Sequence, residues 1–376
     1  MATREVPGSY SSIVKAINAA SSGDIVNIAS GTYSYNISSS VGGLIIQGAT
    51  GDPRDVTIVG TGTSNSDKVV QLHTDDKLKD LTVCYTGSGN SGNVGAAPLC
   101  VRGTGGGYVK FHLENCRFFY QRGGAAGYLA EGSTVHRCWM ESLHKATTHK
   151  TWAVYPTSAR SGNGIIYTSC AMIDNNWADI WSGEGPVINC TISTKYNKNA
   201  GSRRGYYCDE TVNCIAHINA GSTYHSGIDS EDNSIMYNNI SYGWGSDGKD
   251  VVSGGTAANN IVTSTVEAAA KGLPIFINES GSSLNIFAPG DTGLTTGHCL
   301  RIISGSAAHW AGTGSYQQYG TASVDLYGRP FKAGSPSIGC FAYAYAHKVS
   351  GVDPLRVSGS LGASVTSIKT ILGVAT

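Results

Sequence analysis

Short apolar runs, each only a few residues long, recur along this chain, and each begins just after a polar residue. Examples are "LENCRFF", "VHRCWM", "YTSCAMI", "PVINCTIS" and "TVNCIAHI". They are rich in β-branched residues, they are bounded by Gly, Asn and Ser, and they lack the 3.6-residue period of an amphipathic helix. The pattern therefore predicts short β-strands that are joined by tight turns.

One recurring position sets the repeat. Five cysteines follow one another at intervals of 20 to 32 residues, and the same position is taken by Leu before them and by Asn after them: Leu81, Cys116, Cys138, Cys170, Cys190, Cys214, Asn239 and Asn260. A repeat of this length is too short to bury its own apolar face, so neighbouring repeats must stack. The sequence predicts an all-β protein, a right-handed parallel β-helix (solenoid) with a short N-terminal capping helix.

Stacking gives the cysteines a structural role. Equivalent residues of stacked strands lie about 4.8 Å apart, whereas a disulfide prefers Cβ atoms about 3.5–4.5 Å apart. A small, polarizable thiol fills an interior column well, and no CxxC or HxxxH spacing suggests a zinc site. His144 and His149 are five residues apart, which fits solvated loop histidines better than metal ligands. We expect reduced core thiols, amide ladders at the Asn positions, no metal and no cofactor.

The chain divides into three predicted parts. Residues 1–36 form a cap and first strand, residues 37–343 the β-helix, and residues 344–376 a C-terminal tail for docking or oligomerisation. Within the cap, the apolar positions of a short amphipathic helix precede a turn at "SGD" and the strand "IVNIASGTY": Ile13, Val14, Ala16, Ile17 and Ala20. A helix over the open end of a solenoid protects its exposed sheet edge.

Composition narrows the classes of partner. The chain has 376 residues, 50 of them Gly, and its 26 basic residues balance 26 acidic ones, so no overall charge attracts nucleic acid or an anionic membrane. No apolar run approaches the roughly 18 residues of a membrane span, and "MATREVPGSY" has no apolar signal region. We expect neither nucleic-acid binding nor membrane insertion.

Several motifs carry a family resemblance. "SSIVKAINAASSGDIVNIASGTY" resembles the opening of pectate-lyase-like right-handed β-helix proteins, "PIFIN" and "SGSAAHWAG" resemble later family segments, and "DLYGRPFKAGSPSIGCFAY" resembles the closing one. This chain has Ser337 and Ala342 where the family has Asp and Glu. The resemblance implies the fold, but the same scaffold serves lyases, hydrolases, adhesins and virion proteins.

The last residues point to a virus. "HKVSGVDPLRVSGSLGASVTSIKTILGVAT", residues 347–376, resembles the short tails that end many bacteriophage structural proteins. We therefore expect a virion surface protein of tailspike, fibre or decoration type that is assembled in the host cytoplasm with other virion proteins. By resemblance to phage β-helices it is a homo-oligomer, with a trimer as the common form. The alternative is a secreted polysaccharide lyase or glycoside hydrolase of the pectate-lyase-like group.

Residues 141–250 are the richest in aromatic and acidic side chains, which are the types that bind and cleave polysaccharides. Spacing from the cysteine column places Asp179, Arg203 and Asp229 at similar distances before successive repeats. The candidate catalytic residues are Asp209, Asp229, Asp179 and Arg203, and the candidate carbohydrate-binding residues are Trp181, Tyr206 and Tyr224. The competing interpretation is a merely solvated or self-packed face.

Removal of residues 347–376 is predicted to leave the solenoid folded while assembly is impaired, because "SIGCFAY" closes the stack before the tail begins. Circular dichroism and thermal melting of the truncated chain, beside the full-length chain, measure the folding part of this prediction. A collapse of the β signal on truncation would show that the tail is part of the core.

Overall fold

The computed structural model describes residues 1–60, 68–85, 99–104, 109–120, 125–142, 152–156, 164–173, 178–194, 203–218, 225–229, 235–242, 256–263, 308, 312–314, 323–340 and 342. In some strands only the backbone is described. By internal contacts the chain divides into Met1–Ala342 and Tyr343–Thr376, and the second unit lies outside the described residues. The "PIFIN" segment also lies outside them.

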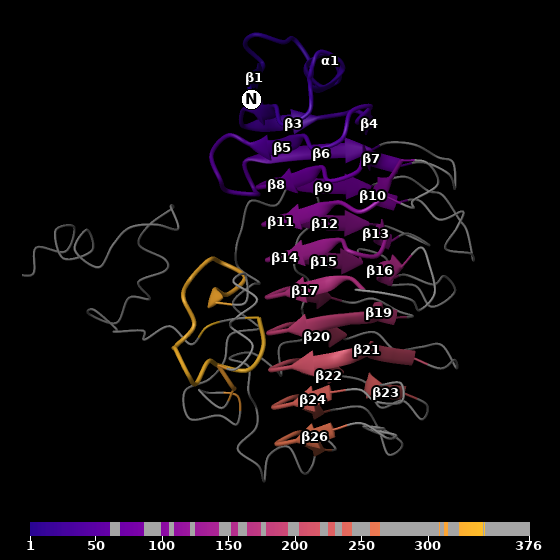
Figure 1. The fold of residues 1–376 in the computed structure, drawn as a ribbon, viewed down its shortest axis with the longest axis vertical. Helices are drawn as coiled ribbons and strands as arrows, with labels where there is room; N and C mark the ends of the chain where they lie inside the picture. The colour runs from indigo at the N-terminus through magenta and orange to yellow at the C-terminus, as the bar shows by residue number, and fades with distance from the viewer. Residues whose placement is uncertain are drawn as a thin grey trace, which may run out of the picture. The chain divides into compact units, whose positions relative to one another are not determined.

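The described strands form a 17-stranded and a 10-stranded sheet, in which every pair of named strands is parallel (Figure 1). Successive repeats contribute to three ladders in turn. The first ladder comprises β1 (Thr3–Val6), β2 (Ile25–Ile28), β5 (Ile45–Gly48), β8 (Lys77–Lys79), β11 (His112–Glu114), β14 (Thr134–His136), β17 (Ile166–Thr168), β19 (Ala178–Ile188), β21 (Arg203–Val212), β24 (Ile235–Tyr237) and β26 (Thr256–Ala258).

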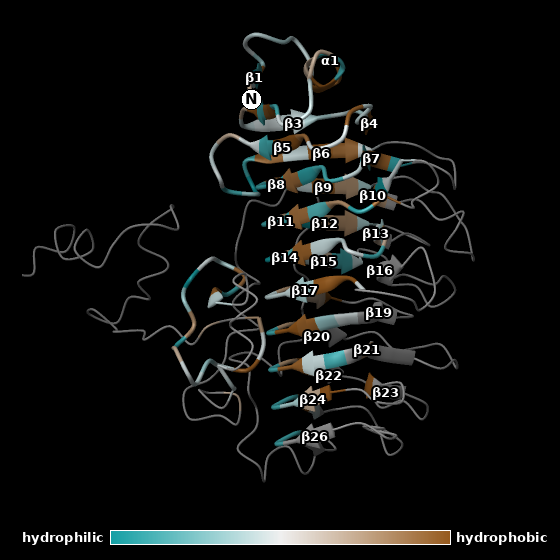
Figure 2. Ribbon diagram, viewed as in Figure 1, coloured by the Kyte–Doolittle hydropathy of each residue, from teal (hydrophilic) through white to brown (hydrophobic). Residues whose placement is uncertain are grey.

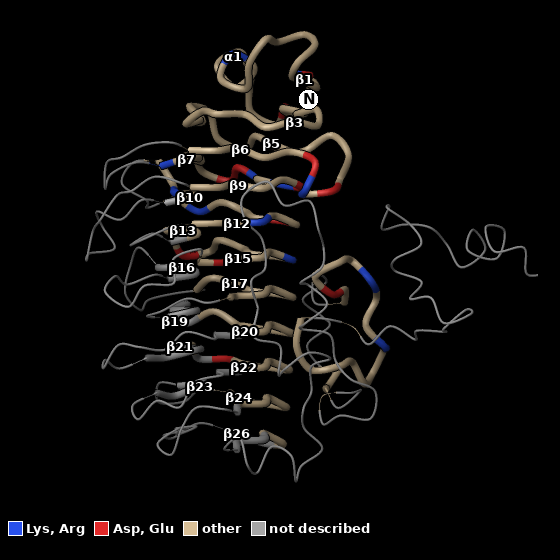
Figure 3. The backbone as a smooth tube through the Cα atoms, turned by 180° about the vertical axis from the view of Figure 1, so that it is seen from behind, with Lys and Arg blue, Asp and Glu red and all other residues tan. Residues whose placement is uncertain are grey.

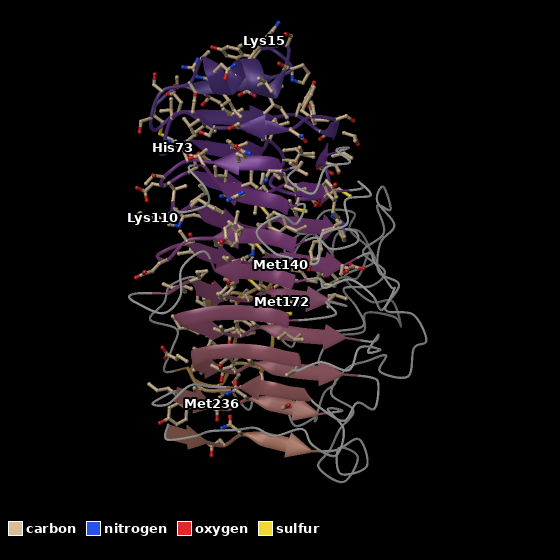
Figure 4. All side chains as sticks on the ribbon, turned by 90° about the vertical axis from the view of Figure 1, so that its right-hand side faces the viewer. Lys15, His73, Lys110, Met140, Met172 and Met236 are labelled. Carbon is tan, nitrogen blue, oxygen red and sulfur yellow. The ribbon has the colours of Figure 1, made fainter. Side chains whose placement is uncertain are left out.

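The second ladder follows the first along the chain within each repeat. It comprises β3 (Gly31–Tyr33), β6 (Val56–Gly60), β9 (Thr82–Tyr85), β12 (Arg117–Tyr120), β15 (Trp139–Ser142), β18 (Ala171–Ile173), β20 (Thr191–Thr194), β22 (Ile215–Ile218), β25 (Ile240–Tyr242) and β27 (Ile261–Thr263). Its inward side chains stack from strand to strand, as Figure 4 shows for Met140 and Met172, which are register partners and fully buried.

The third ladder completes each repeat. It comprises β4 (Ile37–Ser38), β7 (Lys68–Leu72), β10 (Leu99–Gly103), β13 (Ala125–Leu129), β16 (Trp152–Pro156), β23 (His225–Asp229) and parts of β19 and β21. The strands β19 and β21 pair with members of both the third and the first ladder, so these two faces are continuous there. The fold class is confirmed as all-β with parallel sheets, and it is consistent with the predicted parallel β-helix.

The N-terminal cap has one feature that sequence reasoning missed. The helix α1 (Ile13–Asn18) buries Ile13, Ala16 and Ile17 as predicted, but Val14 is exposed. The preceding residues form β1, which pairs with β2 in register and begins the first ladder. "TREV" has only one apolar inward position, Val6, so its apolar pattern is too short to signal a strand.

A sharp corner joins each strand of the first ladder to the next strand of the second. A single residue with φ between 49° and 58° occupies every described corner from β8 onward: Asp80, Asn115, Arg137, Ser169, Asn189, Asn213, Asn238 and Asn259. Asn and Asp tolerate this left-handed conformation better than most residues, which explains why a polar residue precedes each apolar run. The recurring Cys or Asn is the next residue after the corner.

The side chains of the column complete the hydrogen bonding of this corner. From Cys170 to Asn239, the backbone N–H of the column residue donates to the side chain one repeat later: Cys170 to Cys190 Sγ at 3.4 Å, Cys190 to Cys214 Sγ at 3.4 Å, Cys214 to Asn239 Oδ1 at 2.9 Å and Asn239 to Asn260 Oδ1 at 3.0 Å. The thiols and amides in turn donate to backbone carbonyls, as Asn239 Nδ2 does to Thr211 O at 2.7 Å. Cys and Asn can both occupy this position because each side chain can accept one hydrogen bond and donate another.

The thiol prediction is confirmed for the described cysteines. All nine are free and buried, including the five of the column. Burial raises the pKa of Cys138 and of Cys190 well above the ordinary value, and it raises the pKa of Cys84 to about 12. A thiol that stays protonated is a poor nucleophile and a poor metal ligand, so these groups serve packing and hydrogen bonding.

The segment around Asp325, whose sequence resembles the closing motif described above, packs beside the corner residues of the first ladder. Val324 and Leu326 accept hydrogen bonds from the corner residues Ser169 and Arg137, and Cys340 N donates to Thr191 Oγ1 at 2.9 Å. Asp325 is completely buried and is held by Arg329.

At Ala342, the contacts to this pair use only backbone atoms. Ala342 N donates to Asp325 Oδ2 at 3.0 Å, and Ala342 O accepts from Arg329 at 3.3 Å. These contacts therefore do not depend on the side chain at position 342.

Asn239→Leu is expected to lower the free energy of unfolding by about 2 kcal/mol, because it leaves the buried Cys214 N–H and Thr211 O without their partners. Equilibrium unfolding in urea measures the loss. Asn27→Leu makes the same chemical change on the outer face of the first ladder, where we expect a change of roughly 0.5 kcal/mol or less. Equal losses in the two variants would contradict a special role for the column.

Candidate functional site

The predicted site falls on three neighbouring strands. Asp179 and Trp181 belong to β19, Arg203, Tyr206 and Asp209 to β21, and Asp229 to β23. The side chains of these six residues, and all of Tyr224, lie outside the described part of the chain. What the structure does provide is the backbone register that relates them.

That register separates the predicted residues into rows across the strands. Trp181 pairs with Tyr207, and Tyr207 pairs with Asp229, so these three occupy one row. Tyr206 lies in the adjacent row, between Ile180 and the buried Ile228.

Arg203 lies in a different row from both Asp179 and Asp229, with His225 as its partner. The structure thus relates Trp181 to Asp229 through Tyr207, which lies between them in the row and which sequence reasoning did not select.

The spacing argument failed for a specific reason. Counting back from the cysteine column assumes that neighbouring repeats keep one offset throughout, but β19 contains register shifts between Trp181 and Gly183 and between Gly183 and Pro186. Because of these shifts, β19 and β21 pair with one offset in the first ladder and with another in the third ladder. If β19 and β21 are aligned by counting back from the cysteine column, Trp181 is placed two residues away from its true partner on β21.

Glu210 is the described acidic side chain closest in sequence to the predicted site. It lies on the first-ladder part of β21, partly buried, with Pro186 and the exposed Ile235 as its register partners. Burial raises the pKa of its carboxyl above the ordinary value. A carboxyl of this kind suits a proton donor, because it holds its proton to a higher pH than a solvated one.

Charged side chains of both signs also lie on β8 and β11, outside the predicted site (Figure 3). Lys77 Nζ lies 3.2 Å and Lys79 Nζ 3.5 Å from the carboxylate of Glu114. All three side chains are partly exposed, so these ion pairs contribute little and leave no concentrated charge for a ligand. Apolar strand segments recur through the rest of the stack (Figure 2).

Among the described residues, no group of three or more His, Cys, Asp and Glu side chains is placed to hold a metal ion, while His144 and His149 lie outside them. Within the same part of the chain, no helix is long and apolar enough to cross a membrane. In comparisons with known proteins, no family model and no curated protein matches this chain.

Glu210→Gln is expected to stabilise the protein at neutral pH, by roughly 1 kcal/mol or less, and to leave its stability unchanged near pH 3. The folded-state pKa is raised, so folding disfavours the ionised carboxylate; the cost appears as the pH rises above the unfolded pKa and is complete above the folded one. Urea unfolding across this range measures it. The exposed Glu131→Gln serves as the control, and a Glu210→Gln effect that is independent of pH would contradict this account.

Proposed function

We propose that this protein is a bacteriophage virion surface protein, of tailspike, fibre or decoration type, whose β-helix body binds a surface polysaccharide across β19, β21 and β23. The observation that carries the proposal is the register row of Trp181, Tyr207 and Asp229. Aromatic rings present apolar faces to sugars, and a carboxylate accepts hydrogen bonds from sugar hydroxyls. Parallel stacking repeats such groups along one line, which suits a linear polymer.

The virion assignment rests on the tail of residues 344–376 and on the family resemblance. A β-helix that is cross-braced by thiols and amides keeps a long, regular face without disulfides, which suits assembly in a reducing cytoplasm. In this proposal the tail docks onto other virion proteins or joins copies of the chain as a homo-oligomer, with a trimer as the form that the resemblance favours.

A second candidate function is cleavage of the bound polymer, as in a polysaccharide lyase or glycoside hydrolase. The observation that favours it is the partly buried Glu210 on β21, the strand that also carries Asp209 and Tyr207. Glycoside cleavage requires one protonated and one ionised carboxyl group, and burial provides the first of these. In that case Asp209 or Asp229 provides the second.

The proposal predicts that the purified protein is retained by at least one polysaccharide in a panel of bacterial capsular and O-antigen polysaccharides, polygalacturonate and dextran. Affinity electrophoresis measures retention, and size-exclusion chromatography of the treated polymer detects cleavage. For a binding protein, Asp209→Asn and Asp229→Asn weaken retention by no more than roughly tenfold and no polymer is shortened. For an enzyme, one of them abolishes cleavage and spares the fold.

Asp75→Asn, at an exposed position between β7 and β8, is the control and is expected to change neither property. Absence of retention throughout the panel would contradict polysaccharide binding, with or without cleavage.

A further inference from the structure

The corner residues form a hydrogen-bonded line along the stack. At the corners after β8, β11 and β14, Asn115 Nδ2 donates to Asp80 Oδ1 at 2.6 Å, and Arg137 Nη2 donates to Asn115 Oδ1 at 3.2 Å. Three successive repeats are thereby joined side chain to side chain. From Arg137 onward, corner side chains also bond to residues that lie 100 to 189 positions later in the chain.

These later residues belong to what we call the closing segment, which comprises the described residues 308, 312–314, 323–340 and 342. One part of it contacts the corners after β14 and β17. Arg137 Nε donates to Leu326 O at 3.4 Å, and Ser169 Oγ donates to Val324 O at 2.6 Å. Two neighbouring repeats are therefore bound by one stretch of the closing segment.

A second part of the closing segment contacts the next two repeats. Cys340 N donates to Thr191 Oγ1 on β20 at 2.9 Å, and Gly339 N donates to the carbonyl oxygen of the corner residue Asn213 at 2.7 Å. Thr313 and the Asn213 side chain exchange two hydrogen bonds of 2.9 Å. The closing segment thus contacts four consecutive repeats, from the corner after β14 to the corner after β21.

The two parts of the closing segment are held to each other. Leu326 N donates to Cys340 O at 2.8 Å. The buried carboxylate of Asp325 accepts from Ala342 N at 3.0 Å and from Arg329 Nε at 2.7 Å. Because these bonds join the two contacting stretches, displacing one of them also disturbs the other. The closing segment therefore binds the four repeats as one piece.

We propose that the closing segment is a latch that docks on the completed stack and makes these four repeats open and close together. In a solenoid each repeat contacts only its neighbours, so repeats can open one after another from an end. The closing segment is different, because it connects Arg137 to Asn213, which belong to repeats that are not neighbours. Opening any one of the four repeats then also costs contacts between the latch and the others. This role does not depend on polysaccharide binding.

The chain contains its own reporters of this coupling. Each of the four repeats has one buried free cysteine of the column directly after its corner, and the closing segment has another: Cys138, Cys170, Cys190, Cys214 and Cys340. A buried thiol reacts with a labelling reagent only when its surroundings open. Thiol labelling in increasing urea, read for each cysteine by mass spectrometry, therefore gives an opening midpoint for every repeat and for the latch.

Gly339→Ala displaces the latch without changing any repeat. A Cβ atom at Gly339 would lie 2.7 Å from Ile215 Cδ1 and 2.8 Å from Thr191 Oγ1, so the closing segment must move away from the stack. Gly334→Ala is the matched control. Both glycines have left-handed backbones, with φ of 96° at Gly339 and 76° at Gly334. Apart from its chain neighbours, however, a Cβ atom at Gly334 would meet nothing within 4 Å.

In the wild type, we expect one common urea midpoint for the four column cysteines. In Gly339→Ala, Cys340 becomes reactive at lower urea and the four midpoints separate by roughly 0.5 M or more, because each repeat then depends on its neighbours alone. Thr191→Val, which removes the acceptor of Cys340 N, should have the same effect to a smaller extent. In Gly334→Ala, the four midpoints remain together. Circular dichroism checks that each variant is folded before labelling.

Three results would disprove the latch. Separate midpoints in the wild type would show that the four repeats are not coupled, whatever the variants do. A common midpoint in Gly339→Ala, with Cys340 exposed, would show that neighbouring repeats are coupled without the closing segment, which then only covers the stack. Equal separation in Gly339→Ala and Gly334→Ala would attribute the effect to backbone strain within the closing segment rather than to its contact with the stack.

Discussion

The stack depends on one requirement: the buried backbone N–H that follows a corner of the first ladder needs a hydrogen-bond acceptor. A single left-handed residue turns the chain there, and the next N–H lies inside the protein, where an unsatisfied donor costs about 1–3 kcal/mol. The side chain of the following repeat accepts it, from Cys190 Sγ through Asn260 Oδ1. From Cys170 to Asn260, each repeat therefore completes the hydrogen bonding of the previous one, so this part of the stack is stabilised as a chain of neighbours.

This constraint explains why the column changes from Cys to Asn without any change in the fold. Both side chains are small enough for the interior, and both accept from one backbone group while donating to another. The thiol is the weaker partner in each bond, whereas the amide also bonds to the next amide, as Asn239 Nδ2 does to Asn260 Oδ1 at 3.1 Å. The repeats with Asn near the end of the described stack therefore form the stronger hydrogen bonds between neighbouring repeats.

A rigid repeat also prepares a surface for an extended ligand. When every strand of the third ladder keeps its register, one position per repeat forms a straight row, and the residues at that position follow one another at the strand spacing. The cost of ordering these backbone positions is met by the core beneath them, where Val70, Val101 and Ile228 are buried. A preorganised row loses less conformational entropy on binding than flexible loops do, and this is the physical reason for proposing polysaccharide binding on this face.

The sequence by itself determined the fold class, the column of thiols and amides that follows a polar residue in each repeat, and three of the buried positions of the capping helix, Ile13, Ala16 and Ile17. These follow from local patterns, since corner chemistry and β-branched runs leave their mark residue by residue. Only the tertiary structure decided that "TREV" pairs as β1, that the motif around Asp325 packs beside the corners, and that Tyr207 rather than Tyr206 shares a row with Trp181 and Asp229. The reason is that pairing offsets change within a single strand at the register shifts of β19, and hydrogen bonds between strands, not residue counts, set which side chains become neighbours.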